Sequence, residues 1–300
     1  MSKIKVLIIG YGSIGRKYHR ILKKIKEIDD VVIFTSQKKI LNSIDSVSDL
    51  KKINPDIIII SSTSNTHYKY LKIVNSIYKN KRILVEKPLF IKLEKIEHLN
   101  NKIFVGYNLR FLPVIKFLKK YLKKKKVISA AIYCGSYLPS WRKRNINQTS
   151  SYDKKISGGI LLELSHEIDY SRYLFGNLKN IFLISKKLSS LSIKDDDYCN
   201  LAFYTKEKSI INITLNYYSH IKKRFLIIDT KKESFYVDLI NGEITIKSMS
   251  AILKRKFNYD INKTYKEQVL SIIRKKFKDL CSYNDAYETL KTVKQIKKKL

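Results

Sequence analysis

The sequence predicts an α/β protein in two parts: a doubly wound parallel sheet, then an α/β domain with a large, open, mostly antiparallel sheet. In the first part, continuous apolar runs alternate with helical patterns, which is typical of parallel strands buried on both faces. In the second part, apolar and polar residues alternate, which is typical of strands with one wet face. We expect domains at 1–112 and 113–300, with the final helix packing back on the first domain as an open alternative.

The first part contains apolar strands separated by helical segments. The run Ile4–Ile9 is interrupted only by Lys5, and the letters GYGSIG follow at once. Apolar residues three and four positions apart then predict a helix over 14–25. The remaining expected elements are strands at 31–35, 56–62, 83–86 and 102–107 and a helix at 68–78.

The second part begins with a helix expected at 111–122 and a strand at 127–137. A long polar stretch at 138–157 precedes a single helix that starts at two glycines and covers 158–176. Asn241–Glu243 is a hairpin turn signal. Alternating strands are expected at 181–188, 198–205, 209–218, 224–230, 234–239 and 243–248, and helical structure returns from 265.

Composition indicates a globular chain. Apolar residues make up 44% of 300 residues, which is enough for one large or two ordinary cores. No apolar run approaches the roughly 20 residues of a membrane span, and the first run is too short for a signal peptide, so we expect a cytoplasmic protein. The scattered cysteines Cys134, Cys199 and Cys281 show no metal-ligand spacing, so we expect inert thiols and no metal site.

The formal net charge of +35 raises nucleic-acid binding as a possible function. The excess is nearly all Lys, is spread along the chain, and accompanies abundant Ile, Asn and Tyr, all of which have AT-rich codons. The densest basic run, Lys119–Val127, is typical of the solvated end of a helix. Genomic base composition is therefore an alternative explanation of the charge, and we expect no nucleic-acid or membrane partner.

The letters GYGSIG follow a strand and open a helix, which is the setting of a dinucleotide-binding Rossmann fingerprint. Gly10 permits the tight turn, Gly12 lets the backbone approach a pyrophosphate, and Gly15 lets helix and strand pack closely. Ser13 and Ile14 open the helix, whose free amides face the phosphates. The alternative is a plain glycine-rich turn.

The end of the second strand bears on the choice of cofactor. NAD-binding domains usually carry an acid about 20 residues after the last glycine, where it binds the ribose 2′-hydroxyl. Here Thr35, Ser36, Gln37, Lys38 and Lys39 follow the strand and none is acidic. A hydroxyl with lysines suits a 2′-phosphate, so NADP(H) is favoured over NAD(H), with both left open.

Polar residues also follow the strand at 56–62. Because ligands bind at the carboxyl ends of such strands, Ser62, Asn65 and His67 are candidates for the nicotinamide side of a cofactor. The alternative is that Asn65 and His67 cap the helix that follows. The sequence favours neither.

At this point the chain resembles the Gfo/Idh/MocA oxidoreductases. The letters GYGSIG, STSNTH, EKP, GYNLRF and GGILLELSHEID occur in that family's order and spacing, and CSYNDAYETLKTVKQIK resembles its closing helix. The resemblance implies that Lys87 lies beside the nicotinamide and binds the reacting oxygen of a sugar, with Glu86 orienting its surroundings and Pro88 in a cis peptide. It also implies that Asn108 and Arg110 lie near the cofactor.

The resemblance further implies that His166 is catalytic. A hydride transfer between alcohol and ketone also moves one proton, for which His is suited near neutral pH. Glu163, one helical turn earlier, and Asp169, one turn later, are possible supports, although many family members have an Asp four residues before the His. A histidine that only packs the helix is the alternative.

The stretch Tyr137–Tyr152 holds side chains that suit a sugar substrate. Aromatic rings stack on sugar faces, and arginines bind phosphates or carboxylates. This stretch is therefore a candidate substrate loop, with a purely structural loop as the alternative. The side chains concerned are Trp141, Arg142, Arg144 and Tyr152.

Taken together, the motifs and the resemblance predict an NAD(P)-dependent oxidoreductase acting on a sugar or nucleotide sugar. Within the family, the chain most resembles members that act in surface-glycan biosynthesis. A non-catalytic dinucleotide-binding sensor is the alternative. The open sheet of the second domain is expected to be covered by another subunit, and the resemblance implies a dimer or a tetramer of paired dimers.

Overall fold

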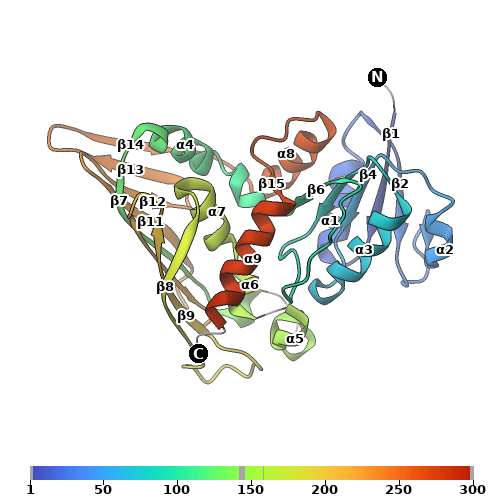
Figure 1. Ribbon diagram of the computed structural model, residues 1–300, viewed down its shortest axis with the longest axis horizontal. Coiled ribbons are helices and arrows are strands. Elements are labelled where there is room, and N and C mark those ends of the chain that lie inside the picture. The colour runs from blue at the N-terminus through green and yellow to red at the C-terminus, as the bar shows by residue number, and fades with distance from the viewer. Residues whose placement is uncertain (1–2, 142–145, 158, 298–300) are drawn as a thin grey trace. The chain divides into compact units, whose positions relative to one another are not determined.

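The computed structural model describes residues 3–141, 146–157 and 159–297 (Figure 1). The chain forms two compact units, Met1–Asn108 with Asn262–Tyr287, and Leu109–Ile261 with Glu288–Leu300. These units are defined by how the residues pack. The predicted domain limits, 1–112 and 113–300, concern parts that fold separately, and they remain a prediction.

The first unit holds a seven-stranded sheet with the order β15-β6-β5-β4-β1-β2-β3. Without β15 this is the strand order of a Rossmann fold, and its pairs are parallel. Figure 1 shows β15, from the carboxyl-terminal part of the chain, beside β6, to which it pairs antiparallel. The strands are β1 (Ile4–Ile9), β2 (Ile28–Phe34), β3 (Ser43–Ile44), β4 (Ile57–Ile60), β5 (Arg82–Val85), β6 (Lys102–Val105) and β15 (Cys281–Ser282). The helices are α1 (Ser13–Leu22), α2 (Val47–Leu50), α3 (His67–Ile77) and α8 (Ile261–Ile273), with the 3₁₀ turn η1 (Ser64–Thr66).

The second unit holds an eight-stranded sheet with the order β14-β13-β12-β11-β7-β10-β9-β8. Among the described strands of this second sheet, β10 and β7 pair parallel and the other pairs are antiparallel. The strands are β7 (Val127–Gly135), β8 (Leu178–Lys186), β9 (Tyr198–Thr205), β10 (Ile210–Asn216), β11 (Lys223–Thr230), β12 (Ser234–Asp238), β13 (Glu243–Lys247) and β14 (Ile252–Lys256). The helices are α4 (Pro113–Tyr121), α5 (Lys154–Ser157), α6 (Ile160–Glu163), α7 (His166–Phe175) and α9 (Tyr283–Lys297), which begins in the first unit. The 3₁₀ turns are η2 (Asn108–Phe111), η3 (Leu122–Lys124), η4 (Leu138–Trp141), η5 (Ile146–Gln148) and η6 (Ser150–Tyr152).

Burial explains why each sheet forms. In β4 all four isoleucines are at most 1% exposed, as expected for a parallel strand covered on both faces. In β9 every second residue is fully buried (Cys199, Leu201 and Phe203), and the residues between them are not. Helices α6 and α7 pack on strands β7, β9 and β10 of that sheet. Each buried aliphatic side chain stabilises its core by about 1.5–3 kcal/mol.

These observations confirm the predicted fold class. The cis peptide implied between Lys87 and Pro88 is present, and Gly242 has a φ of +69° in the predicted hairpin turn. Strands β3, β14 and β15 were not predicted, because two are only two residues long and β14 is exposed throughout.

One predicted element is wrong. The single helix expected at 158–176 is two helices, because the chain leaves the helical path at Leu164, where ψ is +25°. The hydroxyl of Ser165 donates to the carbonyl of Leu162, and such local bonds compete with continued helix. Glu163 and His166 therefore belong to different helices, and the expectation that they are one turn apart on a single helix is wrong.

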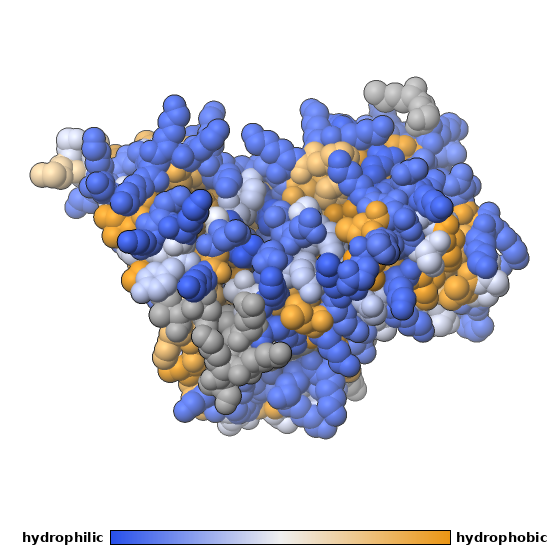
Figure 2. Space-filling model, in the orientation of Figure 1, coloured by the Kyte–Doolittle hydropathy of each residue, from blue (hydrophilic) through white to orange (hydrophobic). Residues whose placement is uncertain are grey.

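Hydrophilic residues cover most of the face shown in Figure 2, over both units, with apolar residues between them. Within the described parts of the chain, no helix has the length and apolar character that a membrane span needs.

Candidate functional site

The glycine loop joins β1 to α1, and its three glycines differ in their surroundings. Gly10 has a φ of +90°, and a Cβ there would lie 2.6 Å from the backbone of Ser62. A Cβ on Gly15 would lie 2.2 Å from the carbonyl oxygen of Gly10. Around a Cβ on Gly12, by contrast, the described residues leave the space open to 4 Å. Packing therefore requires Gly10 and Gly15, whereas the open side of Gly12 fits a ligand.

Helix α1 begins at Ser13 with Gly12 as its N-cap residue, so its first amides have no side-chain cap. Ser13 and Ile14 supply two of these amides, and the first turn contains no acid. Such a helix start favours a phosphate group. The loop therefore has the features that suit the pyrophosphate of a dinucleotide.

The turn after β2 lies against the glycine loop. The side-chain amide of Gln37 donates to the carbonyl of Tyr11 over 3.0 Å, and its backbone N–H donates to the buried Thr35 hydroxyl. Ser36 and Lys38, the predicted 2′-phosphate contacts, are both exposed on this turn. Sequence reasoning passed over Gln37, which ties this turn to the glycine loop.

Lys87 follows the end of β5, and its neighbour Glu86 is buried. The Tyr18 hydroxyl donates to Glu86 Oε1 over 2.6 Å, and the backbone N–H of Lys87 donates to Glu86 Oε2 over 3.2 Å. Burial raises the pKa of Glu86, although Tyr18 and the Lys87 ammonium oppose the shift. A Cβ at Gly106 would lie 2.8 Å from Glu86 Oε1, so this glycine makes room for the carboxylate.

Strand register places Lys87 on the same sheet edge as the glycine loop. Ile9 pairs with Ile60, and Ile60 pairs with Val85, so Gly10 and Glu86 follow the carboxyl ends of the two parallel strands that flank β4. With β4 between them, the two strand ends are about 10 Å apart. This edge is where ligands bind in open α/β sheets.

The STSNTH loop leaves β4 between these two points. His67 is buried, and its ring nitrogens lie 2.8 Å from the Pro88 carbonyl oxygen and 3.1 Å from that of Ser62. Asn65 is exposed, and the N-cap residue of α3 is Thr66, with no side-chain cap bond. Neither of the predicted residues therefore caps α3.

Helix α8 contacts the carboxyl end of β6 and the residues that follow it. The Asn108 side chain donates to the Thr264 hydroxyl over 2.7 Å, and Gln268 donates to the Val105 carbonyl over 3.4 Å. Gln268 also lies 3.3 Å from the Tyr18 hydroxyl. Asn108, predicted near the cofactor, is thus held by α8.

In the second unit, His166 is the first residue of α7 and is partly buried. Two buried acids on this helix are each held by an arginine. Asp169 accepts two bonds from Arg110, at 2.8 and 2.7 Å, and Glu167 accepts two from Arg224, at 2.6 and 3.1 Å. Although burial opposes it, Glu167 raises the pKa of Arg224. The two arginine forks fix the orientation of the helix that carries His166.

Glu163 belongs to a second cluster. Its carboxylate accepts from the Ser151 hydroxyl over 2.9 Å and from the buried Tyr217 hydroxyl over 3.2 Å. The rings of Trp141 and Tyr217 lie edge to face, with centroids 5.5 Å apart. Trp141 is 37% exposed and donates to the Ser136 hydroxyl over 2.8 Å.

The polar loop thus supplies Trp141 to the Glu163 cluster. Tyr152 follows Ser151, and the ring of Tyr152 lies 5.6 Å from the Lys194 ammonium. Arg142 and Arg144, predicted to bind substrate, lie outside the described residues.

The structure also shows which partners the sequence could not indicate. It pairs Arg110 with Asp169 and leaves Asn65, Ser36 and Lys38 exposed. It also sets the Trp141 ring against Tyr217, whose hydroxyl donates to Glu163. Tyr18, Tyr217 and Arg224 were missed because each reads as an ordinary core or strand residue. Among the described residues, no group of three or more His, Cys, Asp and Glu side chains is arranged to hold a metal ion.

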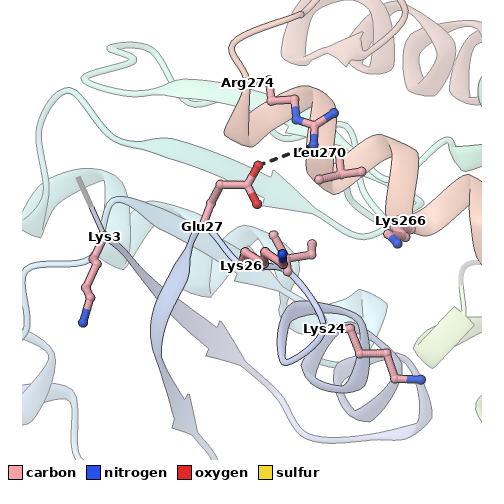
Figure 3. Close-up of a pocket in the computed structure, with 8 residues that line it drawn as sticks. Lys3, Lys24, Lys26, Glu27, Lys266, Leu270 and Arg274 are labelled. Atoms are coloured by element: carbon pink, nitrogen blue, oxygen red, sulfur yellow. Dashed lines mark hydrogen bonds and ion pairs between the residues drawn. The ribbon is translucent and has the colours of Figure 1, made fainter. Parts of the chain in front are cut away.

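Figure 3 shows a different recess of the first unit, of about 480 Å³. It lies near the amino ends of β1 and β2, and Arg274 pairs with Glu27 over 3.4 Å beside it. Its lysines are exposed and point in different directions, and it contains none of the predicted site residues. It is lined by Lys3, Lys24, Ile25, Lys26, Glu27, Lys266, Leu270 and Arg274.

The strand order and the glycine loop define the first unit as a dinucleotide-binding Rossmann domain. Residues 4–103 match the GFO_IDH_MocA family, described as an oxidoreductase family with an NAD-binding Rossmann fold. This match confirms the resemblance to the Gfo/Idh/MocA oxidoreductases and the nicotinamide dinucleotide as the class of cofactor.

Individual proteins show the same likeness. Levoglucosan dehydrogenase from Pseudarthrobacter phenanthrenivorans is 26% identical over 148 residues, which are 45% of this chain and 38% of that enzyme. The structure of an oxidoreductase from Agrobacterium radiobacter with NAD+, L-tartaric acid and magnesium has a TM-score of 0.85 at 13% identity, over 99% of this chain and 96% of that one. UDP-N-acetylglucosamine 3-dehydrogenase from Acidithiobacillus ferrooxidans has a TM-score of 0.80 at 15% identity, over 99% and 97%. At 13% and 15% identity, these two solved structures are evidence that this chain shares their fold.

Proposed function

We propose that this protein is an NAD(P)-dependent oxidoreductase that transfers hydride between the cofactor and a hydroxyl or ketone carbon of a sugar or nucleotide sugar. The observation that carries the proposal is the register that sets the glycine loop and Lys87 on one sheet edge. A cofactor whose pyrophosphate lies on the glycine loop extends along this edge towards Lys87.

In the oxidation direction, the substrate loses a hydride from carbon and a proton from its hydroxyl oxygen, and a C=O bond forms. A bound nicotinamide supplies the hydride acceptor. The Lys87 ammonium holds the reacting oxygen and stabilises negative charge on it. His166 takes the proton, and in the reverse direction it returns it. The roles are exchanged if Lys87 is the base, because lysines with a lowered pKa also act as bases.

The sugar class of substrate is supported by the relatives and by the Trp141 cluster. The relatives named above act on levoglucosan and on UDP-N-acetylglucosamine. In this chain, Trp141 offers a partly exposed ring against Tyr217, whose hydroxyl donates to the Glu163 carboxylate, and rings with carboxylates suit the faces and hydroxyls of sugars. We propose a nucleotide-sugar substrate of surface-glycan biosynthesis within this class.

A substrate screen tests the proposal. Purified protein with NAD(H) or NADP(H) is mixed with sugars and nucleotide sugars, and nicotinamide absorbance is followed. We expect turnover with at least one of them, and loss of that turnover in Lys87→Ala. Tight cofactor binding without turnover on any sugar would instead support the non-catalytic sensor.

We propose NADP(H) as the preferred cofactor, because Ser36 and Lys38 are exposed on a turn that Gln37 ties to the glycine loop. Fluorescence titration of both reduced cofactors measures the preference. NADPH should bind more tightly, and Ser36→Ala with Lys38→Ala should reduce the difference. A clear preference for NADH in the unaltered protein would contradict this proposal.

We propose that the outer face of the second sheet is covered by another copy of this chain. Register aligns Ala131, Ile227 and Tyr236 across β7, β11 and β12, and Ile227 and Tyr236 are 40% and 48% exposed. Phe225 stacks on both Tyr133 and Tyr236 beside them. Light scattering at micromolar concentration should give a dimer or tetramer, and Ile227→Asp should shift it towards monomer. A monomeric mass for the unaltered chain would refute this.

A further inference from the structure

His67 lies between the two loops that leave β4 and β5. It is the first residue of α3, and only 1% of its surface is exposed. Its Nδ1 atom lies 2.8 Å from the carbonyl oxygen of Pro88, and its Nε2 atom lies 3.1 Å from that of Ser62. Because both ring nitrogens face main-chain carbonyls, the ring has no further polar atom for a cofactor or a helix cap.

The number of ring protons decides which carbonyl is bound. A neutral imidazole has one N–H, so it donates to only one of the two oxygens. Burial lowers the pKa of His67, and the nearby Lys87 ammonium lowers it too, against the opposing effect of the Pro88 and Ser62 carbonyls. The ring is therefore neutral near pH 7. The shorter contact, to Pro88, then takes the proton on Nδ1.

We propose that His67 is a positioning residue, whose Nδ1–H donates to the Pro88 carbonyl and so fixes the direction in which Lys87 presents its ammonium. This rests on the proposed function of Lys87. The backbone N–H of Lys87 is already held by Glu86 Oε2 over 3.2 Å, and Glu86 is held by Tyr18. Tyr18 from α1 acting through Glu86, and His67 from α3, thus hold the chain on both sides of Lys87.

Two substitutions distinguish the roles of the two ring nitrogens of His67. The amide of His67→Asn replaces the donor at Nδ1, and the longer amide of His67→Gln replaces the donor at Nε2. We expect His67→Asn to keep most of the turnover. His67→Gln and His67→Ala should lose about 10- to 100-fold, because displacement of a catalytic group by about 1 Å costs that much. Cofactor affinity should be the same in all three, and His98→Asn, at an exposed histidine, is the matched control.

Two further measurements do not depend on turnover. The first is the rate at which an amine-acylating reagent modifies Lys87, followed by peptide mass spectrometry without substrate. It should be similar in the unaltered protein and His67→Asn and should change in His67→Gln. The second is the ¹⁵N spectrum of the unaltered protein, with the His67 signal identified by its absence in His67→Asn. It should show the proton on Nδ1.

The outcomes distinguish this inference from the proposed function. If no sugar is turned over, the proposed function fails, while the Lys87 modification rates and the ¹⁵N spectrum still decide the role of His67. A proton on Nε2 overturns the inference. So does a ranking in which His67→Gln matches the unaltered protein better than His67→Asn, or one in which both match His67→Ala.

Discussion

The surroundings of Lys87 in the first unit and of His166 in the second differ in how their buried acids are held. Glu86, beside Lys87, is held by a neutral phenol, Tyr18, and burial raises its pKa. The acids on the His166 helix, Glu167 and Asp169, are each held by an arginine fork. An arginine stays charged at every pH that a protein meets. The second unit therefore fixes its helix with permanent charges, whereas the charge beside Lys87 responds to pH.

The largest expected effect is on turnover. Lys87→Ala and His166→Ala should each lower turnover by about 10²- to 10⁴-fold, because in the proposed reaction each removes a group that stabilises charge or moves a proton. Cofactor affinity should change little. Turnover and cofactor titration measure the two quantities, with Lys92→Ala and His98→Ala as controls at exposed positions.

The pH dependence of turnover in the two variants separates their roles, because the limb that belongs to the proton-transfer group disappears with it. Near-normal turnover in both folded variants, on a substrate that the unaltered protein converts, would leave Lys87 and His166 as structural residues. The difference between their surroundings would then have no bearing on catalysis.

Breaking one fork should have the next largest effect. Arg110→Met leaves the Asp169 carboxylate buried without its fork, and such losses cost about 3–5 kcal/mol of unfolding free energy. The double variant Arg110→Met with Asp169→Leu should recover most of this stability, since an apolar pair of similar volume is often no less stable. Chemical denaturation measures both. A fall in cofactor affinity without a loss of stability would instead return Arg110 to the cofactor role expected from the sequence.

The sequence predicted what depends on neighbouring residues and missed what depends on distant ones. The glycine loop, the buried strands and the polar strand ends are local patterns, so the fold class and the place of Lys87 after a strand end were readable. Tyr18 and Gln268 meet across 250 positions, and Glu167 and Arg224 across 57, with no local sign of either contact. The break before His166 was missed because residues 160–175 keep a helical pattern, while a single hydroxyl bond marks the break.

Cofactor affinity should depend on the glycine loop of the first unit. Gly12→Val should lower cofactor affinity by about tenfold or more, or about 1.4 kcal/mol, because its side chain would enter the space open beside the loop. Its unfolding free energy should stay close to normal. Gly15→Ala is the contrast, since its Cβ would strike the Gly10 carbonyl and destabilise the fold. Normal affinity in folded Gly12→Val would show that the pyrophosphate lies elsewhere.

The smallest expected effect is the pH response of Glu86. Because burial raises its pKa above the ordinary 4.5, the folded protein binds this proton more tightly than the unfolded chain does. The stability that Glu86 contributes is therefore fully present below about pH 4.5 and is lost as pH rises through the raised value.

Glu86→Gln carries no such charge, and its carbonyl still accepts from Tyr18. Its Tm relative to the unaltered protein should therefore climb with pH across this window. The other acids titrate in both proteins and cancel in the difference. Glu97→Gln, at an exposed acid, should show no such climb. A difference that stays constant or falls as pH rises would show that Glu86 is ionised as easily in the folded protein as in the unfolded chain, and the contrast with the arginine-held acids would disappear.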